Sequence, residues 1–166
     1  TLEAVTYDWN SLGELVGITT PTGTWRFDYD ALGRRTLVEG PGGFTRTFAY
    51  DTHDLARVVY DGTGTVVASY VTGTGFGEVL AEERGGTVRY AVRDKLGTPV
   101  AWLGSGGGVD TLVPRDAYGR RVGGDPADVV PYGYTGHAED PTGVTGRSTC
   151  TLRGREVSRT SLTQRR

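Results

Sequence analysis

The stretch YDALGRRT, Tyr29 to Thr36, holds a complete chain reversal in eight residues. An aspartate at the start of a turn can accept hydrogen bonds from the backbone N–H groups just ahead of it. Glycine takes the positive φ that other residues resist. Tyr29, just before the corner, is expected to pack on its counterparts one repeat away, which would give a row of aromatic rings across the strands. Asp30 and Gly33 are therefore predicted to be turn residues rather than parts of an acid–base site.

Similar short motifs recur along the chain: WNSLG at residues 9–13, YDTHD at 50–54, RDKLG at 93–97 and RDAYG at 115–119. The predicted corners fall at Gly13, Gly33, Asp54, Gly75, Gly97 and Gly119. A second set lies halfway between them, at Gly23, Gly43, Gly64, Gly85 and around Gly106. The chain is thus expected to reverse about every ten residues, which indicates a repeat architecture.

Between the corners, apolar and aromatic residues alternate with polar ones. Trp25, Phe27 and Tyr29 share one face of a predicted strand, with Arg26 and Asp28 on the other. The same period returns in Phe44, Phe48 and Tyr50, in Val66, Ala68 and Tyr70, and in Val88, Tyr90 and Val92. Period two with β-branched and aromatic residues predicts strands, each of about six to eight residues. The predicted fold is all-β, a curved antiparallel meander with little or no helix, whose apolar faces are buried by stacking of neighbouring units.

The composition suits such a fold. Glycine accounts for 27 of the 166 residues and shows no three-residue collagen period. No run of about 18 apolar residues is present, so no membrane-spanning segment is predicted. Cys150 is the single cysteine, which excludes an intramolecular disulfide. A chain that contains no methionine and begins at Thr1 is expected to be a piece of a longer protein.

The charge is distributed unevenly. The net charge is −2, yet residues 144–166 hold six arginines and one acid, Glu156. A basic segment can bind phosphate or anionic lipid. No aromatic residue is interleaved here to stack on bases, so nucleic acid is not predicted as a partner and the segment is read as a solvated end.

The sequence FDYDALGR at residues 27–34, repeated at about twenty-one-residue spacing, resembles the Rhs/YD-repeat family. Four further segments, at residues 70–83, 90–103, 115–123 and 131–144, are similar in sequence and order to the Rhs repeat-associated core. The family includes bacterial polymorphic toxins, insecticidal toxin-complex subunits, wall-associated proteins and teneurins. The resemblance divides the chain into YD repeats (1–69), a core-like region (70–144) and a divergent basic tail (145–166).

The resemblance implies a large β-shell around a hollow interior that, in bacterial members, holds a toxic C-terminal domain until delivery. The implied partners are flanking repeats of the same polypeptide, the enclosed effector and secretion machinery. The implied location is secreted or at the cell surface, as part of a larger bacterial protein. The residues assigned structural turn and repeat roles are Asn10, Gly13, Tyr29, Asp30, Gly33, Tyr50, Asp51, Asp94, Gly97, Asp116, Gly119, Tyr132, Gly133, Gly136, Asp140 and Gly143.

The chain departs from the family pattern after DPTG at residues 140–143. In many members, aspartates beyond this point cut the chain as an aspartic protease. Residues 145–166 contain no aspartate, so the cleavage residues have no match and no enzymatic activity is predicted. We hypothesise a frameshift near residue 145, or else disorder of this tail; the +1 reading frame of the gene tests the frameshift.

Other chemistry is weakly supported by the sequence. Asp28 and Asp30, two residues apart, are expected on one strand face and could form a glycosidase-like carboxylate pair. Cys150 with His137 could form a nucleophilic pair. His53, His137 and Cys150 have no spacing typical of a metal site, and no cofactor is predicted.

Two other functions stay open. The chain could be a cell-surface carbohydrate-binding or adhesion module, or a decayed cassette without a function. The environment of four aromatic residues, Trp25, Tyr29, Phe48 and Tyr50, distinguishes a wall from a binding module. Packing against strands indicates a wall, whereas exposure beside a turn aspartate indicates a ligand site.

Overall fold

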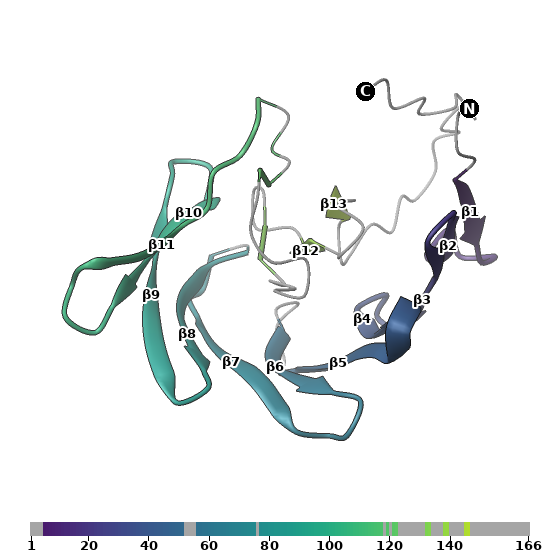
Figure 1. The fold of residues 1–166 in the computed structure, drawn as a ribbon, viewed down its shortest axis with the longest axis horizontal. Helices are drawn as coiled ribbons and strands as arrows, with labels where there is room; N and C mark the ends of the chain where they lie inside the picture. Colours follow the sequence, from purple (N-terminus) through teal and green to yellow (C-terminus); the bar gives the residue numbers. More distant parts are fainter. Residues whose placement is uncertain are drawn as a thin grey trace.

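The computed structural model describes residues 5–51, 56–75, 77–117, 119, 121–122, 132–133, 138–139 and 145–146. Eleven strands form one sheet in which spatial order follows sequence order from β1 to β11. Each neighbouring pair is antiparallel. The prediction of an all-β antiparallel meander is therefore confirmed. The sheet is open and bends into an arc (Figure 1).

The strands are β1 (Thr6–Trp9), β2 (Leu15–Thr20), β3 (Gly23–Tyr29), β4 (Arg35–Gly40), β5 (Phe44–Tyr50), β6 (Ala56–Asp61), β7 (Val66–Thr72), β8 (Val79–Arg84), β9 (Thr87–Arg93), β10 (Pro99–Gly104) and β11 (Val109–Leu112). A short second sheet pairs β12 (Ala138–Glu139) with β13 (Thr145–Gly146), and both are drawn within the arc in Figure 1. A single 3-10 turn, η1 (Pro41–Gly43), is the helical element of the described residues. None of the chain described here forms a helix of the length and apolarity that crossing a bilayer requires.

Within the eleven-stranded sheet, strand lengths differ from the expectation at the two edges. Strands β2 to β10 have six or seven residues, as the alternation predicted, whereas β1 and β11 have four. Most of the predicted corners fall between strands, but Gly23 is the first residue of β3 and Gly119 follows β11. Asp54 lies outside the described residues. Each edge strand has a neighbour on one side only, and this limits the ladder that can hold it.

The same irregularity closes each odd-numbered strand from β1 to β9. The pairing register shifts there, so that the last residue of the strand faces the first residue of the next strand. The five pairs are Trp9 with Leu15, Tyr29 with Arg35, Tyr50 with Ala56, Thr72 with Val79, and Arg93 with Pro99. Because a bulge fixes register and bends the strand, these five positions are structurally equivalent points of successive repeats.

The core lies on one face of the sheet, which we call the inner face and which bears Phe27, Val38, Val59, Tyr70 and Trp102. Two clusters of buried side chains follow each other along it, one on β2 to β4 and one from β6 to β10. Phe48 on β5 packs against both clusters, and this joins them. The core is thus a strip along the sheet, as expected for a repeat protein.

Strand β9 faces the opposite way from the prediction. Val88, Tyr90 and Val92 were expected to form a packed apolar face, but all three are exposed. Arg89 pairs in register with Glu82 and lies on the inner face instead. Periodicity identifies which residues share a face, but the register decides which face is buried. A carboxylate partner makes burial of the arginine tolerable.

Candidate functional site

The stretch from Tyr29 to Thr36 folds into a hydrogen-bonded turn. The Asp30 Oδ1 accepts the backbone N–H of Leu32 at 2.9 Å and that of Arg34 at 3.0 Å. The Gly33 N–H donates to the Asp30 carbonyl at 3.0 Å, and Gly33 has a φ of 75°. Arg34 Nε adds an ion pair to the Asp30 carboxylate at 2.7 Å. One carboxylate therefore accepts three hydrogen bonds within five residues.

Asn10 and Asp94 build the same corner. The Asn10 side-chain oxygen accepts the N–H groups two and four residues ahead at 3.0 and 2.9 Å. The Asp94 carboxylate does so at 2.8 and 2.9 Å. Gly13 and Gly97 donate back to the carbonyls of Asn10 and Asp94 at 3.0 and 3.1 Å. An amide oxygen and a carboxylate oxygen are thus interchangeable in this role.

Two corners are closed by residues that the sequence analysis did not single out. Asp61 accepts the N–H groups of Thr63 and Thr65 at 2.9 and 3.0 Å, at the corner predicted around Gly64. At Gly75 the carboxylate comes from the far side of the turn, where Glu78 accepts the Gly75 N–H at 2.8 Å. The Asp-x-x-Gly spacing at residues 61–64 is a sequence signal for the first corner. Glu78 follows its corner and has no such signal.

The other assigned turn residues have different environments. Asp51 accepts Arg57 Nε at 2.5 Å through its side chain and Arg34 Nη1 at 3.0 Å through its carbonyl. The Asp116 carbonyl accepts the Gly119 N–H at 3.0 Å. Gly133 is buried, whereas Gly136, Asp140 and Gly143 lie outside the described residues.

The tyrosines before the corners bond to the preceding strand. The Tyr29 hydroxyl donates to the Leu15 carbonyl at 2.8 Å, and the Tyr50 hydroxyl donates to the Arg35 carbonyl at 2.6 Å. Leu15 and Arg35 are the first residues of β2 and β4, so the contact is the same in successive repeats. Burial raises the pKa of Tyr50 well above its ordinary value, which keeps this hydroxyl a donor.

Tyr132 makes the corresponding contact with β6. Its hydroxyl donates to the carbonyl of Ala56, the first residue of β6. Its ring packs edge-on against Tyr70, with centroids 5.1 Å apart. Burial raises the pKa of Tyr132 as well.

Guanidinium groups lie over the aromatic rings of the inner face. Arg35, which is buried, has its guanidinium carbon 4.4 Å from the Phe27 ring centroid and 5.9 Å from that of Tyr29. Arg34 lies 4.8 Å from the Tyr50 ring centroid. Such contacts stabilise a desolvated arginine. Rows of alternating rings and guanidinium groups therefore run along the wall, where the sequence predicted aromatic rows.

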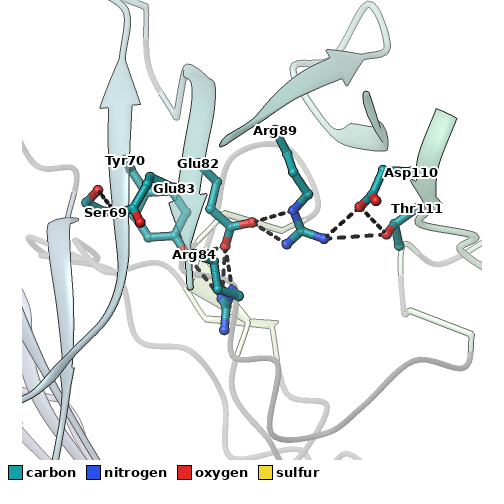
Figure 2. A network of polar contacts seen from close by, with 8 residues as sticks. All are labelled: Ser69, Tyr70, Glu82, Glu83, Arg84, Arg89, Asp110 and Thr111. Carbon is teal, nitrogen blue, oxygen red and sulfur yellow. Dashed lines mark hydrogen bonds and ion pairs between the residues drawn. The ribbon is translucent and has the colours of Figure 1, made fainter. Parts of the chain in front are cut away.

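A buried carboxylate lies at the centre of a second polar network (Figure 2). Glu82 is 1% exposed and accepts the Tyr70 hydroxyl at 3.1 Å. Arg84 donates to one of its oxygens at 2.9 and 3.0 Å, and Arg89 donates to the other. Arg89 also reaches Asp110 at 3.2 Å. Two acids and two arginines from β8, β9 and β11 compensate one another, so the network ties three strands together.

The carboxylate pair considered in the sequence analysis does not form. Strand β3 ends at Tyr29, and Asp30 lies in the turn with its carboxylate bound to backbone N–H groups. Asp28 stays on the strand, 3.7 Å from Arg26. The expectation that Asp28 and Asp30 share a strand face is therefore wrong, because the bulge and corner begin between them. His53, His137 and Cys150 lie outside the described residues.

The four aromatic residues that distinguish a wall from a binding module are packed against the protein rather than exposed to solvent. Trp25, Tyr29 and Phe48 pack against the buried cluster of β2 to β4. Tyr50 is half-buried and carries a guanidinium over its ring. Their environment is that of a wall and not that of an open sugar site.

The family model described as Teneurin YD-shell matches residues 1–145 of the chain. A crystal structure of TcdB2-TccC3-TEV superposes with a TM-score of 0.59 at 18% identity, over 86% of this chain and 8% of that chain. The Photorhabdus luminescens Tc holotoxin pore superposes with a TM-score of 0.57 at 19% identity, over 85% of this chain and 8% of that one. These likenesses show the fold, and the chain spans only 8% of the length of either protein. The search of curated proteins gives no significant match.

Proposed function

Since the chain belongs to the teneurin YD-shell family, we propose that it forms part of a wall that encloses or presents a C-terminal effector domain in a larger bacterial protein. The larger protein would be secreted or delivered by contact. A YD-repeat shell fragment is a structural component and not an enzyme. Residues 1–69 would supply YD repeats and residues 70–144 the core-like region of that wall.

The observation that carries the proposal is the open arc. The strand order begins with β1 and ends with β11, so the described sheet has two edges. Trp9, on the β1 edge, is 61% exposed, and Leu112 on β11 is also exposed. An edge with unpaired backbone groups and exposed apolar side chains favours continuation by another strand. The partners expected at both edges are flanking repeats of the same polypeptide.

The enclosed effector is supported by likeness to the toxin structures. One similar structure is TcdB2-TccC3 without its hypervariable C-terminal region, which superposes with a TM-score of 0.57 at 17% identity. By analogy, a variable C-terminal segment would follow the wall in this protein and would be the cargo. Secretion machinery would be a further partner at delivery.

Protease protection in the full-length protein tests enclosure. One version carries a specific cleavage site in the C-terminal segment, and a matched control carries the same site at the N-terminus. We expect the C-terminal site to resist cleavage until the protein is denatured, while the N-terminal site is cut at once. Equal cleavage rates at both sites in the native protein would contradict the proposal.

A further inference from the structure

Of the five equivalent strand-final positions, those of β3 and β5 hold a tyrosine, whereas β1, β7 and β9 end in Trp9, Thr72 and Arg93. The strand-final position of β3 is Tyr29, that of β5 is Tyr50 and that of β7 is Thr72. All three face the first residue of the next strand across a register shift. Thr72 therefore occupies the position where the two preceding repeats have their tyrosine.

The missing tyrosine leaves a defined acceptor. Tyr29 and Tyr50 each donate to the first residue of the strand before their own, Leu15 in β2 and Arg35 in β4. The same rule places the third acceptor at the carbonyl of Ala56 in β6. A threonine hydroxyl is attached to Cβ and cannot reach where a phenol hydroxyl ends, so Thr72 cannot make this bond.

Tyr70, the tyrosine nearest to Thr72 in the sequence, forms its hydrogen bond with a different residue. It lies two residues before the end of β7, and its hydroxyl is 3.1 Å from Glu82 and 3.5 Å from Arg84. Its hydroxyl thus belongs to the carboxylate network of β8. Its ring packs edge-on against the ring of Tyr132, with centroids 5.1 Å apart.

Tyr132 fills this position from 76 residues away in sequence. Its hydroxyl donates to Ala56, its ring meets the Tyr70 ring, and its side chain is fully buried in the same cluster as Val59. A tyrosine from outside the repeats thus makes the bond that the third repeat cannot make itself.

We propose that the wall contains a tyrosine socket, formed by the Ala56 carbonyl, the Tyr70 ring and the place left free by Thr72, which selects where the segment bearing Tyr132 attaches to the inner face. The partner that the socket fits is a chain segment presenting a phenol. The absence of a tyrosine at position 72 is then a specificity feature, because a repeat with its own tyrosine would have no room for Tyr132. This inference does not depend on an enclosed effector.

Competition for the socket tests the proposal. Thr72→Tyr restores the repeat tyrosine and should displace Tyr132, and Val71→Tyr on the exposed outer face of the same strand is the control. Hydrogen exchange of peptides containing Tyr132 is the readout. We expect exchange to become about fivefold faster or more in Thr72→Tyr, the change that corresponds to one lost hydrogen bond. Exchange in Val71→Tyr should stay as in the wild type.

A rescue experiment separates competition from simple damage. Tyr132→Ala leaves the Ala56 carbonyl without its donor and should lower the melting temperature. Adding Thr72→Tyr to Tyr132→Ala should recover part of this loss, since the new tyrosine supplies the hydroxyl from the repeat position. A double variant no more stable than Tyr132→Ala, or unchanged exchange in Thr72→Tyr, would overturn the proposal.

Tyr132→Phe provides an independent test that preserves the shape of the side chain. It removes only the hydroxyl, so folding should be retained, and exchange near residue 132 should be about fivefold faster because one hydrogen bond is lost. Exchange identical to the wild type in this variant would show that the hydroxyl does not fix the segment, and the socket would be wrong.

Discussion

At the scale of single residues, a turn of this chain depends on one side-chain oxygen. Asp30 Oδ1 accepts two backbone N–H groups that the reversal removes from the sheet ladder. We expect Asp30→Ala to lower the free energy of unfolding by about 1–3 kcal/mol, because both donors lose their acceptor. Asp30→Asn should cost less, since Asn10 closes an equivalent corner with an amide oxygen. Urea denaturation at pH 7 measures both.

Asp28→Ala is the matched control for this prediction. Asp28 is two residues away, and its side chain is 47% exposed. Arg26, with which it forms an ion pair, is 3.7 Å distant and more exposed still. A surface pair of this kind contributes less than about 0.5–1 kcal/mol. Losses of equal size for Asp28→Ala and Asp30→Ala would show that the corner bonds do not stabilise the fold.

The turn carboxylates also predict how stability depends on pH. Burial acts to raise the pKa of Asp30, but the backbone and side-chain hydrogen bonds from Arg34 outweigh it and hold the pKa below its ordinary value. A hydroxyl donor lowers the pKa of Asp61 and Asp110, and a backbone N–H lowers that of Glu78. Four carboxyls therefore have a greater affinity for protons in the unfolded chain than in the folded one.

A group whose folded pKa is depressed stabilises the fold above its unfolded pKa, and this contribution is lost as the pH falls through the folded pKa. The free energy of unfolding should thus be nearly constant from pH 7 to about 5 and fall below about pH 4. In Asp30→Asn, the free energy of unfolding should decrease less steeply below about pH 4. Urea midpoints measured between pH 3 and 7 check this, and parallel curves for the variant and the wild type would exclude a depressed pKa at Asp30.

The corners at Asn10, Asp30 and Asp94 could be predicted from the sequence because every bond in them spans at most four residues. The contacts of Glu82 and Tyr132 could not. Glu82 meets Arg89 only through the register of two strands, and Tyr132 meets a carbonyl 76 residues away. No local pattern carries such information, since it arises only when the sheet has formed.

At the scale of strands, the Glu82 network holds β8, β9 and β11 together. Glu82→Gln keeps the shape but removes the charge that compensates Arg84 and Arg89. Removing one partner of a buried ion pair costs about 3–5 kcal/mol. We expect a loss of stability in or somewhat below this range, because Arg89 keeps its contact with Asp110. Thermal or urea unfolding measures it.

Glu83→Gln is the control from the adjacent position. Glu83 lies on the opposite face of β8 and accepts hydrogen bonds from Ser69 and from the Gly86 N–H, at 3.1 and 3.0 Å. In Glu83→Gln the amide oxygen can accept the Gly86 N–H while the amide NH2 donates to the Ser69 hydroxyl, so the expected change is less than about 1 kcal/mol. A Glu82→Gln loss no larger than the control would mean that the buried charge is not needed for strand association.

A glycine in β4 is required by the packing of its neighbour. A Cβ at Gly40 would lie 2.6 Å from Cε3 of the Trp25 ring, although the backbone there is extended and unstrained. Gly40→Ala should therefore push the Trp25 ring off the strand and cost about 1–3 kcal/mol. Tryptophan fluorescence and urea denaturation report both effects. Gly106→Ala, where a Cβ meets nothing within 4 Å, should be neutral, and equal effects of the two changes would refute the packing argument.

At the scale of the whole molecule, the meander could be predicted, but its inner face could not. Corner spacing defines where strands begin and end, and strands that are consecutive in the chain pair with each other. Both faces of β9 contain apolar residues, so the alternation of Val88, Tyr90 and Val92 could not show which face is buried. That choice is made by the register in which β9 pairs with β8 and β10.

A wall in which each strand pairs only with its neighbours should unfold from its edges. Strands β1 and β11 have one partner strand each, whereas β5 to β8 have two and share the buried cluster with Tyr132. We expect amide hydrogen exchange to be slowest in β5 to β8 and fastest in β1 and β11. Deleting residues 1–14 should leave exchange in β6 to β9 within about twofold of the intact chain, since stability in repeat proteins is transmitted mainly between neighbours. Uniform protection along the sheet, or collapse of protection in β6 to β9 after the deletion, would instead show one cooperative unit and contradict a wall built by adding strands.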